Sequence, residues 1–356
     1  MRSLPPRAPL PAALLLSLAV SCCTPFSGSE PPLEYHVLSW NVLSLFDAVE
    51  DGTEYPDFSI ARGTWGETRY RNRLALLGKA ILASCKGGTG RPPGPDVVCL
   101  IEIEKETVLA DLVEGPLATG RYRYRSFAKA PGSAIGLGIV SRLPIMATRA
   151  WGLTIGSRSE RPVLEARFDA GGRDLGVFLC HWKSKLEGAE VTEPARREAA
   201  RLLSSLVAAR QAEFPEGALL VCGDFNENPD EFARTGKRYP TAFMPARSPV
   251  APGPAVEPCI LLGDRKATAA GGSTLFSPWS ESDAYSYVHR GIRERIDGFL
   301  LGAALLDGKG LEYRDFRVWD EGLVDGEGRP LPWSGTTGTG CSDHLPIVLG
   351  LVAAGD

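Results

Sequence analysis

The sequence lacks three features that would each have pointed to a familiar class of protein. None of its eight cysteines forms a Cys-X-X-Cys pair, which argues against a zinc site built from thiolates. The apolar run near the N-terminus, LPAALLLSLAV at residues 10–20, is well short of the ~20 residues that an α-helix needs to span a bilayer. No internal repeat is visible. Histidine is also scarce, with four in 356 residues, so the place of each one carries information.

The first residues have the composition of an export signal. Two arginines precede the short apolar run and small residues follow it, which is the arrangement of a secretory signal peptide. The sequence LAVSC resembles the lipobox of bacterial lipoproteins, with Ala19 where leucine is more usual. We therefore expect a signal peptide at 1–21, lipidation of Cys22 and a flexible tether at 22–34. The protein would then be exported and held by its lipid at the bacterial cell envelope, in the periplasm or on the outer surface.

The chain as a whole has the composition of a soluble globular protein, 44% hydrophobic and 23% charged. The formal net charge of −4 gives no general attraction to nucleic acid. Cys99, Cys180 and Cys222 lie inside apolar runs, where buried free cysteine is common. Export would permit disulfides, but the sequence alone leaves their pairing open.

Short apolar runs typical of buried strands recur from residue 35 onward: YHVLSWNVL, DVVCLIEI, SAIGLGIVS, VLEARFD, LGVFLCHW, ALLVCG, RIDGFLLG and HLPIVLGLV. Helical periodicity falls between some of them, over 68–85 and most clearly over 193–214. Glu193 and Pro194 suit the N-terminus of the second helix. Several strands are not followed by a helix, which favours mixed sheets covered by helices over a doubly wound parallel sheet. We expect an α/β (α+β) fold in a single domain at 35–354.

A proline-rich stretch interrupts this pattern. Residues 229–282 contain eight prolines and five glycines. Irregular segments of that length are usually functional or disordered. We expect a long irregular insertion there, within the single domain.

Polar residues stand at the ends of these apolar runs, where packing alone would favour apolar ones. They are Asn41, Glu102, Glu104, His181, Asp224, Asn226, Asp297, Asp343 and His344. Taken singly each has an ordinary explanation; GDFNENP, for instance, has the composition of a turn. Together they include two of the four histidines, and carboxylates that enter apolar strands are costly unless they are paired or bind a metal. Phosphoester hydrolysis needs such a set, with oxygen ligands for Mg²⁺ and groups that move protons.

The ordered series WNV, LIEIE, CHWKSK, GDFNENP, ERIDGFLL and SDHLPIVLGL resembles the endonuclease/exonuclease/phosphatase superfamily, which has the DNase I-like fold. It runs from Asn41 to His344, and GDFN together with SDH is its most specific part. The resemblance implies a four-layer sandwich of two packed mixed β-sheets flanked by helices. It also implies a phosphoric-ester hydrolase that activates a water, with Mg²⁺ or Mn²⁺ as cofactor; Ca²⁺ stays open as a structural ion.

The resemblance assigns the metal site position by position. Asn41 and Glu102 match the asparagine and glutamate of the family's metal site, and Asp343 matches a further metal-linked carboxylate. Ile101 stands where the family commonly has glutamine. Glu104, two residues further on, is an alternative ligand, although its place in the motif favours Glu102.

The catalytic positions follow in the same way. Asp224 and Asn226 match the pair that orients the attacking water and contacts the phosphate. His344 matches the C-terminal histidine of the family, supported by the aspartate that Asp297 resembles. His181 matches the second histidine of the nuclease and sphingomyelinase-like branches, which assists the phosphate and the leaving group.

The sequence constrains the substrate less. His181 and the expected export argue against the abasic-site repair branch. RERIDGFLL has glycine directly after its aspartate and no tryptophan, whereas the inositol phosphatases typically have an arginine there in a tryptophan-containing motif. Lys183 and Arg290 lie near the proposed site in sequence and are candidates for contacts to phosphate. The aromatic segments 56–67 and 273–281 would suit a lipid substrate if they were exposed, and would equally suit packed loops.

We therefore predict an exported phosphodiesterase that acts on DNA as a nuclease, as a monomer, and meets the membrane through its N-terminal lipid. A phospholipid or sphingomyelin phosphodiesterase and a phosphomonoesterase are the alternatives within the same chemistry. An alternative of another kind is an inactive surface lipoprotein that keeps the fold as a binding module. None of the family's metal or histidine positions is missing, which favours an enzyme.

Overall fold

The computed structural model describes residue 1 and residues 33–88, 90–246 and 260–354. The predicted signal peptide, Cys22 and nearly all of the predicted tether lie outside these residues. Pro32–Asp356 forms one compact unit, separate from Met1–Pro31. In the described part of the chain, no helix is both long enough and apolar enough to cross a membrane.

Two large mixed β-sheets form the centre of this unit. The first has six strands in the order β15-β16-β1-β2-β4-β3, namely β1 (Glu34–Leu45), β2 (Val97–Ile103), β3 (Tyr124–Ala128), β4 (Gly136–Ser141), β15 (Leu311–Val318) and β16 (Ile347–Ala353). The second has eight strands in the order β5-β6-β7-β8-β14-β11-β10-β9, namely β5 (Ile145–Ile155), β6 (Arg158–Asp169), β7 (Asp174–His181), β8 (Ala218–Asp224), β9 (Phe243–Pro245), β10 (Ile260–Gly263), β11 (Thr274–Phe276) and β14 (Asp297–Leu301). A separate hairpin consists of β12 (Tyr287–His289) and β13 (Ile292–Glu294).

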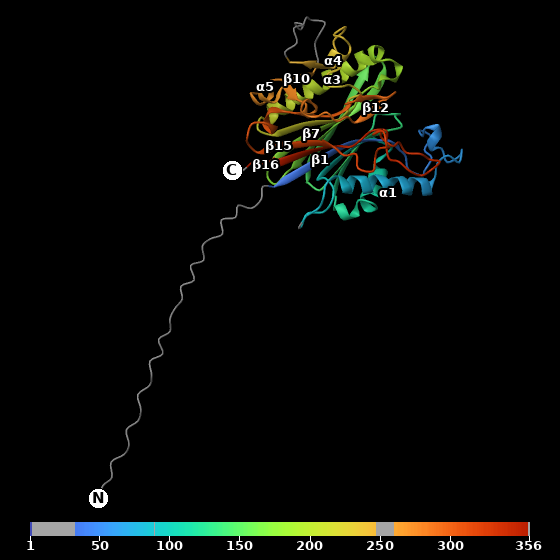
Figure 1. The fold of residues 1–356 in the computed structure, drawn as a ribbon, viewed down its shortest axis with the longest axis horizontal. Coiled ribbons are helices and arrows are strands. Elements are labelled where there is room, and N and C mark those ends of the chain that lie inside the picture. The colour runs from blue at the N-terminus through green and yellow to red at the C-terminus, as the bar shows by residue number, and fades with distance from the viewer. Residues whose placement is uncertain (2–32, 89, 247–259, 355–356) are drawn as a thin grey trace. The chain divides into compact units, whose positions relative to one another are not determined.

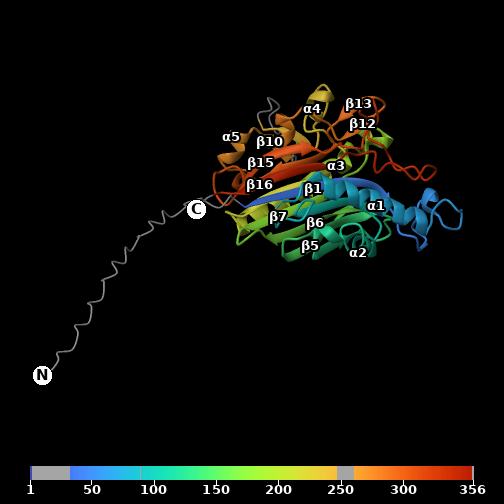
Figure 2. The same ribbon diagram turned by 60° about the horizontal axis from the view of Figure 1, so that its bottom comes forward.

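The two sheets pack face to face, and helices cover their outer faces (Figures 1 and 2). The helices are α1 (Glu67–Ser84), α2 (Glu106–Glu114), α3 (Ala189–Glu213), α4 (Glu231–Arg234) and α5 (Arg265–Ala269). Short 3₁₀ helices span Pro56–Phe58, Ala118–Gly120, Lys185–Glu187, Pro278–Glu281 and Ala303–Leu305. Figure 1 shows α3 on one side of the strands and α1 on the other. The predicted four-layer DNase I-like sandwich is confirmed.

Three apolar clusters account for the layers. Alternating residues of both sheets, such as Cys99 and Leu220, are fully buried between the sheets, as expected for strands whose side chains point to opposite faces in turn. The apolar stripes of α1 and α2 pack on the outer face of the first sheet. The stripe of α3 packs on the outer face of the second sheet. The predicted buried free thiols at Cys99, Cys180 and Cys222 are present, and Cys259 lies outside the described residues.

Helix α3 starts earlier than the sequence predicted. The helix begins at Ala189, directly after Gly188, whose φ of 108° favours glycine. The Arg196 guanidinium donates to the Ala189 carbonyl oxygen at 2.7 Å and so ties down the first turn. Pro194 therefore lies inside the helix, and the prediction that Glu193 and Pro194 mark its start was wrong.

The segment at 229–282 is more regular than the predicted irregular insertion. Its described residues form α4 and α5, and β9, β10 and β11 extend the second sheet. Phe243, Ile260 and Leu275 pack under α3, so this part contributes to the core. Pro245 is the last residue of the edge strand β9, a place where the missing N–H of proline removes no ladder hydrogen bond.

Candidate active site

Three neighbouring strands of the second sheet meet at one edge with polar residues. His181 ends β7 and lies opposite Asp224, the last residue of the parallel strand β8. Asp224 in turn lies opposite Asp297, the first residue of the antiparallel strand β14. Because β14 runs the other way, its start falls at the same edge as the ends of β7 and β8. The sheet register therefore brings together residues 116 positions apart, from 181 to 297.

The first sheet contributes Asn41 and Glu102 to the same place. Glu102 lies in a bulge of β2 with φ of 70°, and such bulges re-aim a side chain. Asn41 Nδ2 donates to Glu102 Oε1 at 3.2 Å and to Asp224 Oδ2 at 3.0 Å, which joins the two sheets. Ser44 Oγ donates to Glu102 Oε2 at 2.8 Å. Asn41 turns its amide oxygen to the backbone N–H of Leu43, at 3.0 Å.

Glu104 points elsewhere. Its side chain is fully buried and Oε2 accepts a hydrogen bond from the backbone N–H of Asp47 at 2.7 Å. The ammonium of Lys105 lies 3.4 Å from Oε1. Burial, together with the Asp47 carboxylate, raises the pKa of Glu104 to about 7. Of the two glutamates considered for the metal site, Glu102 lies with the other polar residues and Glu104 does not.

Asp224 is a buried carboxylate at the centre of the site. It is 1% exposed, and its Oδ1 accepts from the backbone N–H of Asn226 at 2.8 Å. Burial, followed by the nearby Asp297 carboxylate, raises the pKa of Asp224 to about 7. Asn226 has φ of 49°, a left-handed conformation that asparagine tolerates, and its Nδ2 donates to the Trp182 carbonyl at 3.2 Å. The GDFN segment is thus a turn, and it aims two polar side chains into the site.

His344 and Asp297 form a buried pair. His344 Nδ1 donates to Asp297 Oδ2 at 2.8 Å, and the Tyr287 ring packs on the imidazole with 4.6 Å between centroids. Burial opposes a charge on His344, but the carboxylates of Asp297 and its neighbours outweigh it and raise the pKa to about 10. Within the described chain, the buried Oδ1 of Asp297 has no hydrogen-bond partner. Because its ring packs on the imidazole, Tyr287 helps to fix the plane of His344. The sequence did not single out Tyr287.

His181 lies between the two carboxylates on the other side. Its Nε2 is 3.7 Å from Glu102 Oε1 and 3.6 Å from Asp224 Oδ2. Burial and the positive charge of Arg161 lower the pKa of His181 well below its usual value. Arg161 itself donates to the Trp182 carbonyl oxygen at 2.5 Å. The pKa values of the two histidines are therefore shifted in opposite directions, downward for His181 and upward for His344.

The donor set fits a hard divalent cation at the mouth of the site. The side chains of Glu102 and Asp343 are 15% and 37% exposed, whereas those of Asp224 and Asp297 are 2% and 1% exposed. Burial and the Glu102 carboxylate raise the pKa of Asp343, which places the two acids in each other's field. Two accessible carboxylates are oxygen ligands of the kind that Mg²⁺ takes in proteins, whereas Asn41 faces them with its amide nitrogen. Deeper in, ligand atoms of Asp224, Asp297 and His344 all lie within 4.8 Å of one another.

A family model described as Endonuclease/Exonuclease/phosphatase family matches residues 36–238, more than half of the chain. The chain belongs to this family. No curated protein matches it at a significant level.

Solved structures agree on the fold. Truncated Caenorhabditis elegans TDP2 is 14% identical over 90% of this chain and 98% of its own, with a TM-score of 0.52. The catalytic domain of human nocturnin is 16% identical over 90% of this chain and 96% of its own, at 0.52. A family protein from Bacteroides thetaiotaomicron is 14% identical over 91% and 99%, also at 0.52. At these identities the likeness to solved structures establishes the fold alone. The candidate site is defined by the residues described above.

Lys183 and Arg290, the two residues predicted to contact phosphate, lie outside the hydrogen-bonded network of the other predicted site residues. The ammonium of Lys183 lies 2.6 Å from Oε1 of Glu187, four residues further along the chain, in an ion pair at the surface. Arg290 is exposed, with φ of 49°, in the turn between β12 and β13. Neither residue is part of the hydrogen-bonded set around Asp224. Their role as contacts to phosphate stays a prediction.

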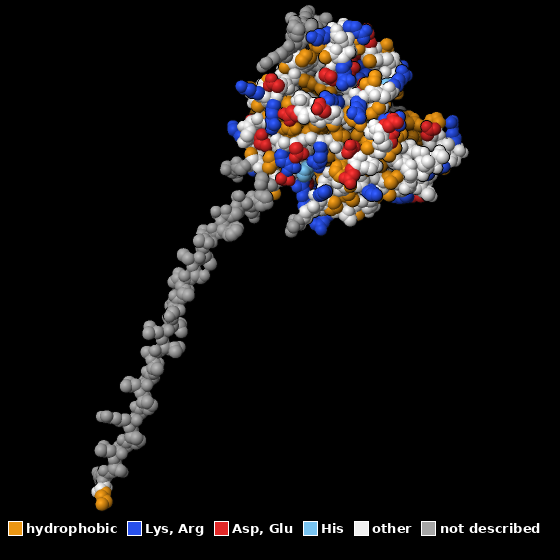
Figure 3. Space-filling view, in the orientation of Figure 1, with side chains coloured by type: hydrophobic (Ala, Val, Ile, Leu, Met, Phe, Trp, Pro, Cys, Tyr) orange, Lys and Arg blue, Asp and Glu red, His pale blue; other side chains and the backbone are white. Residues whose placement is uncertain are grey.

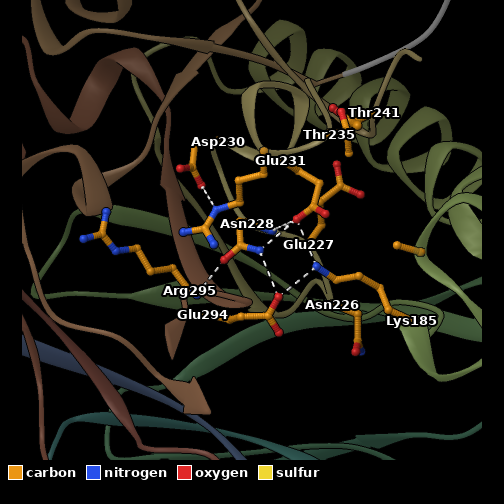
Figure 4. Close-up of polar contacts among 12 residues, drawn as sticks. Lys185, Asn226, Glu227, Asn228, Asp230, Glu231, Thr235, Thr241, Glu294 and Arg295 are labelled. Atoms are coloured by element: carbon orange, nitrogen blue, oxygen red, sulfur yellow. Dashed lines mark hydrogen bonds and ion pairs between the residues drawn. The ribbon is translucent and has the colours of Figure 1, made fainter. Parts of the chain in front are cut away.

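A second polar network, which the sequence did not reveal, holds the GDFNENP turn (Figure 4). Asn228 donates through Nδ2 to Glu231 Oε2 at 2.8 Å and accepts at Oδ1 from the backbone N–H of Arg295 at 2.8 Å. Lys185 places its ammonium 2.9 Å from Glu231 and 3.4 Å from Glu294. Burial opposes the charge on Glu231, yet Lys185 and Asn228 lower its pKa. The network fixes the turn against the strand that carries Asp297.

A third set is buried below the turn. The Arg196 guanidinium lies 2.6 Å from Glu193 Oε2 and 2.9 Å from Glu227 Oε2, and none of the three side chains is more than 4% exposed. The remaining carboxylate oxygens accept from the backbone N–H groups of Ala242 at 2.7 Å and Phe243 at 2.9 Å. This triad joins α3, the turn and β9. Glu227, which looked like part of a polar turn, is a structural residue.

Proposed function

We propose that this family member is an exported, divalent-metal-dependent phosphodiesterase that cleaves nucleic acid, with DNA as its principal substrate. The observation that carries the proposal is the meeting of Asn41, Glu102, His181, Asp224, Asn226, Asp297, Asp343 and His344 at one edge of the packed sheets. The set contains oxygen ligands, a carboxylate that can take a proton near neutral pH, and a cationic imidazole. Hydrolysis of a phosphoester by an activated water needs all three.

Glu102 and Asp343 are the residues that would hold the cation. When bound, a divalent ion would neutralise charge on the phosphate oxygens and stabilise the departing oxygen. Asn41 already orients the Glu102 carboxylate through its amide nitrogen, and Ser44 does so through its hydroxyl. Both carboxylate oxygens of Glu102 are thereby held in place before any substrate arrives.

Asp224 is the proposed base. It lies below the mouth of the site, and with a pKa of about 7 its carboxylate is ionised in much of the protein at neutral pH yet basic enough to accept a proton. Its Oδ1 is fixed by the backbone of Asn226 and its Oδ2 by Asn41. The amide of Asn226, next to it, is the proposed contact to the water and to a phosphate oxygen.

The histidines serve the phosphate. His344 is kept protonated by Asp297, so that its Nε2–H can donate to an oxygen on which negative charge develops. His181 is neutral and donates or accepts at Nε2, which lies between Glu102 and Asp224. A neutral imidazole at this place can form a hydrogen bond with the leaving or the attacking oxygen, and it does not hold phosphate through a permanent positive charge.

One observation favours nucleic acid over other phosphoesters, and a second limits how such a substrate would be recognised. The structure of D. rerio TDP2, 16% identical over 89% of this chain, was solved in complex with a single-strand DNA product. The face drawn in Figure 3 carries Lys and Arg interspersed with Asp and Glu over its described surface. Long-range attraction to a duplex is therefore weak on that face, and recognition would depend on groups next to the scissile phosphate. Export and lipid attachment at Cys22 remain part of the proposal on the basis of the sequence.

The test is a substrate panel with the purified protein. Plasmid DNA, single-stranded DNA, sphingomyelin vesicles, bis(p-nitrophenyl) phosphate and p-nitrophenyl phosphate are incubated with Mg²⁺ or Mn²⁺, alongside His344→Ala. His36→Ala is the matched control, because His36 lies on the same sheet at the opposite end of β1 from Asn41. We expect metal-dependent cleavage of DNA that His344→Ala loses and His36→Ala keeps. If sphingomyelin alone is cleaved, the lipid alternative replaces this proposal, and if no phosphoester is cleaved, the enzyme proposal fails.

A further inference from the structure

A cavity of about 580 Å³ adjoins the proposed site and takes no part in the chemistry described above. Its walls come from two distant parts of the chain, the segment after β1 with Tyr55, Phe58 and Trp65, and the loop before β16 with Trp333. Both views in Figures 1 and 2 show these segments side by side at the same end of the molecule. The size is within the range of small-molecule pockets.

Four aromatic rings line the cavity, and two of them pack against the buried ring of Phe46. Phe46 is fully buried and contacts the rings of Tyr55 and Phe58, with centroids 5.3 and 4.8 Å apart. Trp65, 5% exposed, contacts Phe58 at 5.0 Å and Trp333 at 6.3 Å. Tyr55 is 41% exposed. The inner rings are therefore fixed, while Tyr55 keeps a large part of its surface accessible.

The cavity adjoins the proposed metal site through one shared residue. Ser44 lines it and also donates its hydroxyl hydrogen to Glu102 Oε2 at 2.8 Å. Burial and the charge of the Glu102 carboxylate raise the pKa of Tyr55, so Tyr55 lies within the electrostatic reach of that carboxylate. A phosphate bound at Glu102 would place its own substituent at the mouth of this cavity.

The two walls are held in position without a ligand. Arg69 Nε donates to the Gly335 carbonyl at 3.2 Å, and Asn72 Nδ2 donates to the Gly338 carbonyl at 2.7 Å. Both donors belong to α1, so the helix fixes the loop that carries Trp333. A preformed pocket binds without the entropic cost of ordering its loops.

We propose, on the basis of the proposed function, that this cavity receives an unstacked nucleobase of the nucleotide that adjoins the scissile phosphate. Aromatic rings beside a phosphate site are the usual means of holding single-stranded nucleic acid, because every base has a π-face that stacks on them. The edges of the cavity carry the hydroxyl groups of Ser44, Thr64 and Thr336, which can hydrogen-bond the polar rim of a base.

The charge and polarity of the cavity argue against a choline headgroup and against an acyl chain as its occupant. The buried Arg73 guanidinium lies 5.6 Å from the Phe58 ring centroid and 5.8 Å from that of Trp333. Arg69 lines the cavity as well. A choline cation would meet these two positive charges beside the single carboxylate of Asp57, and the cation–π positions on the Phe58 and Trp333 rings are already taken by Arg73. An acyl chain would bring apolar groups against the Asp57 carboxylate and the Arg69 guanidinium, which both line the cavity.

A base can enter the cavity only after leaving its stack. The enzyme should therefore prefer single strands or frayed ends to intact duplex, since unstacking a paired base costs a few kcal/mol. This preference follows from the pocket and not from the metal chemistry, which acts on any phosphodiester.

The experiment compares two matched oligonucleotides. One is single-stranded DNA, and the other has the same phosphates with tetrahydrofuran abasic residues in place of the nucleosides. Tyr55→Ala and Trp333→Ala should each lower kcat/KM on the DNA about tenfold, the usual effect of removing one stacking ring, and should change kcat/KM on the abasic strand by less than about twofold. Tyr55→Phe, which keeps the ring, should retain the rate on DNA.

Tyr124→Ala is the matched control. Tyr124 is 37% exposed, close to the 41% of Tyr55, and lies opposite Ser141, while Ser141 lies opposite Val97 at the start of β2. It is thus at the far end of the sheet from Glu102. The control should leave both rates unchanged.

The outcomes separate this inference from the proposed function. Equal losses on both oligonucleotides, or no loss on either, would overturn the base pocket while leaving the hydrolase intact. Loss of sphingomyelin cleavage but not of DNA cleavage in Tyr55→Ala would assign the cavity to a lipid and also overturn it. Absence of metal-dependent turnover on every phosphoester would overturn both proposals together.

Discussion

Replacing Arg196 by methionine tests whether the buried triad holds the GDFNENP turn. The guanidinium is 0% exposed and contacts Glu193 and Glu227, which are 4% and 0% exposed. It also donates to Thr192 Oγ1 at 2.8 Å and to the Ala189 carbonyl at 2.7 Å. Methionine fills a similar space but leaves two buried carboxylates without a cation. Removal of one partner from a buried ion pair costs about 3–5 kcal/mol.

Urea denaturation measures this cost. We expect the unfolding free energy to fall by about 4 kcal/mol, which is a large part of the 5–15 kcal/mol typical of a folded domain. Arg201→Met is the control, because the ion pair of Arg201 with Glu198 has side chains 51% and 38% exposed and such pairs are worth about 1 kcal/mol or less. If Arg196→Met costs no more than the control, the triad does not stabilise the turn and the reasoning is refuted.

The pH dependence gives a second check on the same variant. Burial and the neighbouring Glu193 carboxylate raise the pKa of Glu227 in the folded state. A carboxyl group whose pKa is higher in the folded than in the unfolded state opposes folding when it is ionised, so its penalty is absent below the unfolded pKa, grows between the unfolded and the folded pKa, and is constant above the folded pKa. The loss caused by Arg196→Met should therefore be larger at pH 8 than at pH 5. Adding Glu193→Gln and Glu227→Gln should recover most of it.

Three further predictions concern the site itself. His344→Ala and Asp224→Asn should each lower kcat by about 10²–10⁴-fold, the usual contribution of a proton-transfer group, with circular dichroism unchanged; loss of the folded signal would leave the roles unsupported. A chelator should abolish turnover and added Mg²⁺ restore it, and saturating Mg²⁺ at ~100 times its Kd should stabilise the fold by about 2.7 kcal/mol; an unchanged melting temperature and rate would contradict a metal site. Lys183→Ala should leave kcat/KM within about twofold because its ion pair is exposed. Lys185→Met should lower the unfolding free energy above pH 5, because Lys185 lowers the pKa of Glu231 and its loss leaves that carboxylate unpaired. A large loss of kcat/KM in Lys183→Ala, with no loss of stability in Lys185→Met, would restore Lys183 as the functional lysine.

The strands and the main helices were predictable because they depend on local pattern. Apolar runs bounded by polar residues identified β1, β2, β4, β6, β7, β8, β14 and β16, and the 3.6-residue repeat identified α1 and α3. The short strands β9, β10 and β11 were not predictable in this way. Three or four residues among prolines carry almost no periodicity, and these become strands only because a sheet edge and α3 are there to pack against.

The choice between neighbouring polar residues needed the tertiary structure. Glu102 and Glu104 are two apart and would share one face of a regular strand, but the bulge at Glu102 turns the first toward Asn41 and leaves the second near Asp47. Likewise, the spacing of Lys183 and Lys185 does not reveal that Lys185 reaches Glu231 and Glu294 from other elements. These contacts depend on backbone irregularity and on residues far away in sequence.

By itself the sequence determined which residue types are available, where the strands end, and the order of motifs that relates the chain to its family. Only the tertiary structure decided that residues as distant as Asn41 and His344 stand at one edge, and that Tyr55 and Trp333 line one cavity. The physical reason is one of range. Strand and helix formation follow from neighbours along the chain, whereas the meeting of such distant side chains depends on sheet register, on which strands pair and on how two sheets pack.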